Sequence, residues 1–300
     1  MPGWYLYSVF AFALRVVGKG GPLIFHTSIF YLIGCNMSKG TPQRGYQVAE
    51  QESDYSQCWA SSLGDCEGLI SHEHLISKCL FPDGDINVRG FAWCKDVHKP
   101  IRIETLTGKI LCEKHNGCLS EVDAAAKVSL ESMMKAFALF KVRDGLKVRR
   151  WTIKHFVVDM LLLERWCLKT LINLNHQHGW LIGTNPSEPH IPTKELVEVA
   201  FGRRRFTHSE GLYMVAKTGE RITLNEGALS IGTTTDGDKL VAGRFTLWGV
   251  PFVLSILPEP INATNGATLM RRNMKHGFQT HDDKGRLVTS HFVTFTYPLD

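Results

Sequence analysis

The 300-residue sequence has no apolar run long enough to cross a membrane, no internal repeat and no low-complexity tract. A membrane-spanning helix needs roughly 20 consecutive apolar residues, and the apolar runs at residues 4–14 and 23–34 are much shorter. The first run has no basic segment before it and no small-residue cleavage site after it, which argues against a secretory leader. We therefore expect a globular, cytoplasmic chain that is not held in a membrane.

The first 57 residues differ in composition from the rest of the chain. Residues 1–36 hold both apolar runs, and Met37 opens a polar stretch rich in Gly, Ser and Gln. We interpret Met37 as the true start of translation and residues 1–57 as a poorly structured extension. A membrane hairpin or anchor formed by residues 4–34 is the alternative interpretation.

The chain also lacks a strong excess of either charge, with 34 Lys and Arg against 29 Asp and Glu and a formal net charge of +5. This balance permits a phosphate-rich partner but does not require one. Basic residues gather at 141–154, 203–205 and 271–272. These clusters favour an anionic partner, although solvated helix faces or loops would give the same pattern.

Cysteine, in contrast, is well represented and unevenly placed. Five of the eight cysteines lie within residues 58–112, close to histidines. A chain of this length with a full hydrophobic complement does not need disulfides in order to fold. Crowded cysteines beside histidine therefore indicate a metal site rather than a set of disulfides.

Hydrophobic periodicity predicts an α+β protein. Helices are expected at 121–139, 152–173 and 194–201, with Ser120 as N-cap and Asp123 in a capping-box-like position for the first of them. Period-two patterns predict strands at 211–216, 221–224, 228–233, 239–247, 250–257 and 291–296. Four regions follow: the extension at 1–57, a Cys/His-rich module at 58–140, a connecting helix and linker at 141–192, and a β-rich C-terminal domain at 193–300.

Four residues of the module form a candidate structural zinc site. Such a site usually takes four Cys or His ligands as two close pairs from different parts of the chain. Cys112 and His115 have the spacing of one pair, and Cys58 and Cys66 supply the other. Cys94 is a competing fourth ligand.

Glu73, His74 and Asn116 are candidates for hydrolytic chemistry. An imidazole suits a general base near neutral pH, and a carboxylate with an amide oxygen suits a hard Mg²⁺ or Mn²⁺ ion. If residues 69–76 are a strand, alternation puts Glu73 and His74 on opposite faces, and a kink at the strand end is needed to bring both to one site.

Glu-His on a strand, followed by Cys-x₂-His-Asn at the start of a helix, resembles the zinc-containing HNH (His-Me finger, ββα-metal) endonucleases. More distantly, Glu73–Lys78 and Leu111–Asp123 resemble a group of bacterial HNH-like proteins. The resemblance implies that Glu73 and Asn116 ligate the catalytic metal and that His74 is the general base. It assigns Cys58, Cys66, Cys112 and His115 to the structural zinc. Candidates for orienting His74 are Asn87, Thr107 and Lys109.

The function implied is hydrolysis of phosphodiester bonds in nucleic acid, DNA rather than RNA, with one Mg²⁺ or Mn²⁺ ion and a structural Zn²⁺. Lys78, Lys109 and Lys114 would hold the phosphate backbone. No small-molecule cofactor is expected, and the C-terminal domain would choose the target or bind a partner. The alternative is a catalytically inactive, zinc-stabilised module that binds nucleic acid or another protein.

Overall fold

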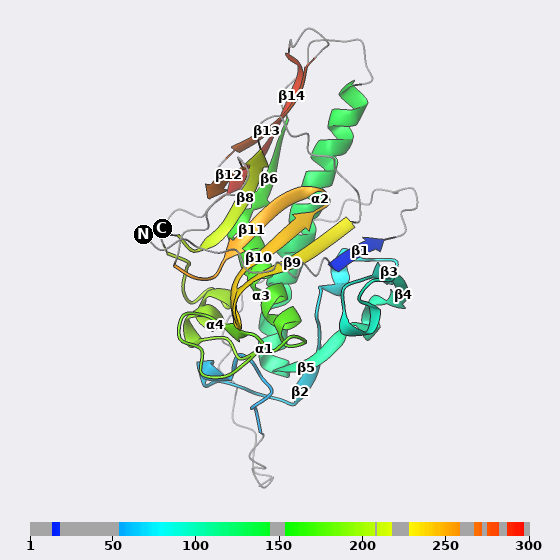
Figure 1. The fold of residues 1–300 in the computed structure, drawn as a ribbon. Coiled ribbons are helices and arrows are strands. Elements are labelled where there is room, and N and C mark those ends of the chain that lie inside the picture. The colour runs from blue at the N-terminus through cyan, green and yellow to red at the C-terminus, as the bar shows by residue number, and fades with distance from the viewer. Residues whose placement is uncertain are drawn as a thin grey trace, which may run out of the picture.

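The structure is a computed structural model that describes residues 14–18, 54–144, 154–207, 209–217, 228–258, 267–271, 275–281 and 287–296. It contains both helices and strands, with two helices beside a large curved sheet (Figure 1). The predicted α+β class is therefore confirmed at this level. Within these residues no helix is long and apolar enough to span a membrane.

The main sheet has the strand order β12-β8-β11-β10-β9-β1-β3-β4, and neighbours along this path run antiparallel. A short β7 pairs in parallel with the start of β10. Tight turns at Asp236-Gly237 and Trp248-Gly249 connect β9 to β10 and β10 to β11, as the sequence predicts. The strands are β1 (Leu14–Gly18), β3 (Asp85–Val88), β4 (Lys99–Arg102), β7 (Leu181–Ile182), β8 (Gly211–Lys217), β9 (Ala228–Asp236), β10 (Lys239–Leu247), β11 (Val250–Ser255) and β12 (Ala267–Arg271).

Two helices lie beside this sheet. α3 (Met160–Asn175) contacts β8, β10 and β11 and also the long α2 (Ser120–Asp144). Most of α3 is buried, including Trp166 and Leu171, as expected of a helix enclosed by other elements. The short α4 (Lys194–Ala200) packs against α3 and agrees with its prediction. A second sheet, β13 (Lys275–His281), β14 (Leu287–Thr296) and β6 (His155–Asp159), packs against α2.

The predicted helix at 152–173 is wrong in its first part. His155–Asp159 form strand β6, which pairs in parallel with β14, and the helix begins at Met160. Phe156, Val157 and Val158 favour a strand when a partner strand is present. The Asp159 carboxylate then accepts hydrogen bonds from the N–H groups of Leu161 and Leu162, which fixes the helix start.

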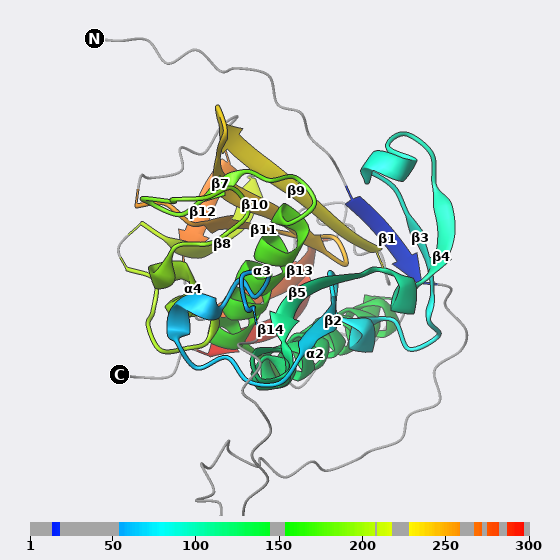
Figure 2. The ribbon, with the colours of Figure 1, turned by 90° about the horizontal axis from the view of Figure 1, so that it is seen from below.

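The Cys/His-rich region forms a β-hairpin followed by a helix. β2 (Ile70–His74) pairs antiparallel with β5 (Thr107–Cys112), and α1 (Glu113–Cys118) leads directly into α2. This is the predicted ββα order, although the catalytic metal site that the resemblance adds to it remains a prediction. A bulge lies between Ser71 and His72. The long connection between the paired strands carries β3 and β4 into the main sheet, as Figure 2 shows.

Three smaller differences from the predicted elements concern unpredicted strands and one helix cap. Leu14–Gly18, inside the extension expected to be poorly structured, form β1 between β9 and β3. Most of residues 1–57, including Met37, lie outside the described residues, as does the strand predicted at 221–224. Strands β12 and β13 were not predicted. Ser120 is not an isolated N-cap, because α1 precedes it and its hydroxyl donates to the Gly117 carbonyl.

Candidate zinc centre and the polar cluster beside it

Cys58, Cys66, Cys112 and His115 converge on one point. Their ligand atoms all lie within 4.8 Å of one another, and the three sulfurs are 3.4, 3.6 and 3.2 Å from His115 Nδ1, in the order of the chain. Tetrahedral zinc with ordinary bond lengths separates a sulfur and a nitrogen ligand by about 3.6 Å. The donor set and its spacing therefore fit zinc bound through Nδ1.

Local structure explains why these four residues meet. Cys112 ends β5, and His115 follows it in the first turn of α1. Cys58 and Cys66 lie in the loop before β2. This loop is fixed to the hairpin, because the backbone N–H of Trp59 donates to the Ile110 carbonyl at 3.0 Å. Gly68 has a φ of +76° and passes so close to Glu113 that a Cβ would lie 2.4 Å from its carboxylate. Glycine is required there for the loop to lie against the start of α1.

The other face of His115 is also held. Its Nε2 lies 3.0 Å from the Asp65 carboxylate, which also contacts Arg203 at 2.9 Å and Lys114 at 3.4 Å. Partial burial opposes ionisation of Asp65, but these partners lower its pKa to about 2. A carboxylate on the second nitrogen of a ligating histidine fixes the tautomer that leaves Nδ1 for the metal. Phe201 packs edge-on against the ring, with centroids 5.2 Å apart.

The remaining cysteines of the region lie outside this cluster. Cys94 is buried in a short 3-10 turn at Ala92–Cys94, so it does not replace Cys58 or Cys66 among the described residues that could hold a metal. Burial raises the pKa of both the Cys58 and the Cys66 thiols. These two thiols therefore keep their protons at neutral pH, and a zinc ion would displace them on binding.

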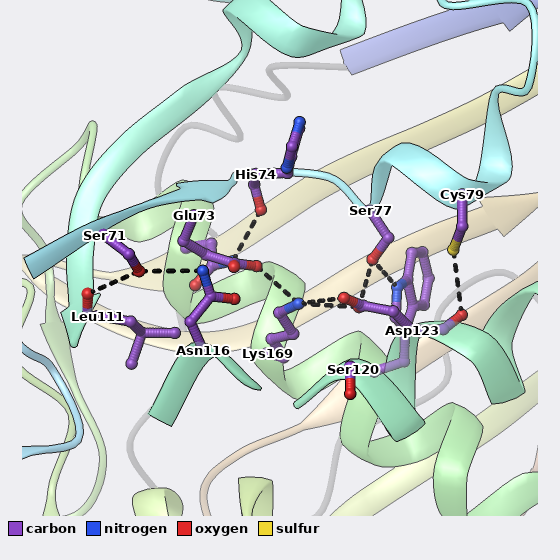
Figure 3. Close-up of polar contacts among 12 residues, drawn as sticks. Ser71, Glu73, His74, Ser77, Cys79, Leu111, Asn116, Ser120, Asp123 and Lys169 are labelled. Atoms are coloured by element: carbon purple, nitrogen blue, oxygen red, sulfur yellow. Dashed lines mark hydrogen bonds and ion pairs between the residues drawn. The ribbon is translucent and has the colours of Figure 1, made fainter. Parts of the chain in front are cut away.

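A buried polar cluster lies farther along the hairpin from the Cys₃His group, toward the other end of β2, and is centred on Lys169 of α3 (Figure 3). Its ammonium is 2.6 Å from Glu73 Oε1 and 2.7 and 2.8 Å from the two Asp123 oxygens. Both Lys169 and Glu73 are almost fully buried. Ser77 donates to Asp123 at 2.5 Å and accepts from the Trp166 indole N–H at 2.8 Å. The cluster joins β2, α2 and α3.

The opposite charges in this cluster favour each other's ionised forms. Burial raises the pKa of Glu73, and the Lys169 ammonium opposes that rise. For Lys169, burial alone would lower the pKa, but the carboxylates of Asp123 and Glu73 raise it above its ordinary value. Lys169 is therefore protonated at neutral pH. Two carboxylates share one ammonium, so the group carries a net negative charge when both are ionised.

Glu73 and Asn116 lie on the same side of β2, and the His74 imidazole points to the other side (Figure 3). Asn116 donates to the Ser71 hydroxyl at 3.0 Å, which in turn donates to the Leu111 carbonyl. The predicted alternation of Glu73 and His74 is therefore present. The bulge lies before both residues and does not bring them to one face.

His74 is half-buried, and its Nε2 is covered and has no hydrogen-bond partner within the described part of the chain. Burial lowers its pKa, and the positive charges of Lys78 and Lys169 lower it further. The ring is therefore neutral at pH 7, as a base must be. Its backbone carbonyl accepts from the Asn173 amide at 3.1 Å, and that amide also reaches Glu73 at 3.4 Å.

The other predicted site residues are more dispersed. Thr107 lies opposite His74 across the hairpin, whereas Asn87 lies in β3 of the main sheet. Lys78 pairs with Glu104 at 3.0 Å, and Lys114 pairs with Asp65. Lys109 is exposed on β5, opposite His72, which is also exposed.

Sequence reasoning missed the part that α3 plays at this site. Lys169 and Asn173 are four positions apart in a helix with a broad apolar face, so they share one side of the helix. That spacing was the available indication that this face meets polar groups. Asp123 lies in the first turn of α2, as predicted, and its carboxylate also binds Lys169, which was not predicted. Comparisons with protein-family models, curated proteins and solved structures find no match to this chain, so the site is interpreted from its own geometry.

Proposed function

We propose that this protein is a metal-dependent nuclease whose zinc-stapled ββα module is of the HNH type. The observation that supports it is the arrangement of the hairpin and α1 around the Cys₃His cluster, with Glu73 and Asn116 together on one side of β2. His74 is the last residue of that strand. An imidazole as base, with a carboxylate and an amide oxygen as metal ligands, suits metal-assisted phosphodiester hydrolysis.

The donors for a hard divalent cation are the Glu73 carboxylate and the Asn116 side-chain oxygen. Lys169 competes for Glu73, since its ammonium already lies 2.6 Å away. It is also held by both oxygens of Asp123, so it keeps a carboxylate partner if Glu73 turns to a metal. A bound Mg²⁺ or Mn²⁺ ion would supply charge stabilisation at the phosphate and the leaving oxygen.

His74 would take the proton from the attacking water. To do so, the backbone at the end of β2 must turn so that the ring reaches the side that holds Glu73, because strand alternation points the Cβ atoms of Glu73 and His74 to opposite faces. Because Nε2 makes no hydrogen bond within the described residues, that movement breaks none at this atom. The low pKa keeps the base unprotonated before reaction. Lys109 is exposed beside the hairpin and would contact the phosphate backbone of DNA.

A second candidate function is binding of nucleic acid without hydrolysis. Two observations favour it: Glu73 is enclosed in an ion pair with Lys169, and the His74 ring points away from the Glu73 side (Figure 3). In this case the zinc and the buried cluster would be structural, and the divalent cation would have no role.

Nicking of supercoiled plasmid DNA with Mg²⁺ or Mn²⁺ separates the two functions. We expect the wild-type protein to relax the plasmid, and His74→Ala to retain zinc and fold but to lose at least about a hundredfold in rate. His72→Ala is the matched control, because His72 lies on the same strand, is exposed and has no proposed role. A wild-type protein that shifts DNA in a gel but never relaxes it supports the binding function. Equal nicking by wild type and His74→Ala removes His74 from the mechanism.

A further inference from the structure

Residues 89–102, in the connection between the paired strands β2 and β5, carry an exposed aromatic ring in basic surroundings. Trp93 is 46% exposed and is the only aromatic among the large exposed hydrophobic side chains of the described residues. One flat ring lies beside it: Phe91, itself buried, stacks nearly parallel with Trp93 at 5.5 Å between centroids and 10° between planes. The β3–β4 hairpin that bears this segment lies at the side of the molecule (Figure 2).

Trp93 is held in place rather than loosely attached. Lys99 donates from its ammonium to the Trp93 backbone carbonyl at 2.8 Å, and the same nitrogen lies over the ring, 5.6 Å from its centroid. The turn is closed by backbone hydrogen bonds from Cys94 to Phe91 and from Gly90 to Cys94. A preformed ring loses little conformational freedom when a ligand stacks on it.

The segment that carries the ring has more basic than acidic residues. Residues 89–102 contain four basic residues, Arg89, Lys95, Lys99 and Arg102, and a single acidic one, Asp96. Arg102 is partly compensated, because it lies 3.4 Å from Glu104 and 3.8 Å from Asp85. The remaining excess is positive, in a chain whose whole net charge is only +5. The chemistry that complements it combines an anionic backbone with flat, unpaired rings.

We propose that Trp93 and the basic residues around it form a binding site for single-stranded nucleic acid. A base stacks against Trp93, and Lys95 and Lys99 contact the flanking phosphates. A single strand fits better than a duplex, because bases inside a duplex already stack on one another and do not offer their faces. The site deepens the proposed function by naming the form of its substrate, and it does not depend on cleavage taking place.

Fluorescence anisotropy with labelled oligothymidylate and the full-length protein, without divalent cations, tests this site. Loss of one stacking partner weakens binding of single strands about fivefold to hundredfold, so Trp93→Ala should raise Kd by that factor. Trp93→Phe should restore most of the affinity, because a ring remains. Lys95→Ala should reduce the dependence of Kd on salt. Val128→Ala, also exposed but on α2, is the matched control and should bind as the wild type does.

Unchanged zinc content and melting temperature show that the Trp93 variants are folded. The proposal is overturned if Trp93→Ala binds oligothymidylate as tightly as the wild type does. It is overturned equally if a duplex binds as tightly as the single strand, or if polyglutamate competes as well as the oligonucleotide. Trp93-dependent binding by a wild-type protein that never cleaves DNA would leave this site intact and refute only the nuclease.

Discussion

Replacing Lys169 by Met removes the only ammonium within contact of two acidic side chains in the buried cluster. Glu73 would then be a buried carboxylate with one amide donor 3.4 Å away, and Asp123 would keep the Ser77 hydroxyl. Breaking a buried ion pair by removing one partner costs about 3–5 kcal/mol, because the other charge stays buried and uncompensated. That is a large part of the stability of an ordinary domain.

Urea unfolding at neutral pH, followed by tryptophan fluorescence, measures this loss. The matched control is Lys135→Met, because Lys135 forms an exposed pair with Glu131 at 3.7 Å on α2. Solvent screens that pair, so its loss should cost less than about 0.5 kcal/mol. Adding Glu73→Gln to Lys169→Met should recover roughly 1–3 kcal/mol, since the amide that remains buried carries no charge.

Two results would refute this reasoning about the cluster. One is a loss for Lys169→Met no larger than that for Lys135→Met, which would mean that the three charges are not buried together in solution. The other is a double variant less stable than Lys169→Met alone, which would mean that Glu73 is stabilised by something other than the ammonium.

Three further predictions concern metals and pH. Cys112→Ser should lose zinc and unfold at lower temperature, whereas Cys118→Ser, outside the cluster, should keep both properties; metal analysis and a melting curve decide. Mn²⁺ should raise the melting temperature of Lys169→Met more than that of the wild type, because loss of the ammonium leaves two carboxylates for the cation; equal shifts would speak against a cation at Glu73. Burial, and then the neighbouring His190, lower the pKa of His176. The unfolded chain therefore binds more protons, and stability should fall as the pH drops below about 6.5. His176→Gln should weaken that fall in melting curves recorded across this range, and an unchanged pH profile would contradict the assignment.

Sequence patterns are sufficient where structure depends on near neighbours. Cys112 and His115 are fixed by one strand end and one helical turn, so their spacing identifies half of the zinc site. The strand β10 matches its prediction at both ends, because alternating side chains and two tight turns define it locally. The pairing of Cys58 with Cys66 was harder to predict, since their wide spacing departs from the usual ligand pair and a loop anchored on Ile110 brings them together.

Sequence patterns do not predict structure that depends on a partner far away in the chain. The segment His155–Asp159 has an apolar content that suits either a helix or a strand, and pairing with β14, more than a hundred residues later in the chain, selects the strand. The contact between Glu73 and Lys169 joins residues from β2 and α3. No local periodicity encodes such a pair, although the shared side of Lys169 and Asn173 in a largely buried helix indicates that polar groups lie opposite them.

The hairpin that carries Glu73 is fixed at both of its ends, and this bears on which function it serves. At one end, Cys112 and His115 share the zinc cluster with the preceding loop. At the other end, Asn173 holds the backbone of His74, and Lys169 holds Glu73. A catalytic cation at Glu73 would therefore have to displace the Lys169 ammonium, which lies 2.6 Å from the Glu73 carboxylate. Hydrolysis requires that Lys169 release Glu73 and stay bound to Asp123. The contacts of the Lys169 ammonium with both Asp123 oxygens allow this, because the ammonium keeps a carboxylate partner when Glu73 turns to the cation.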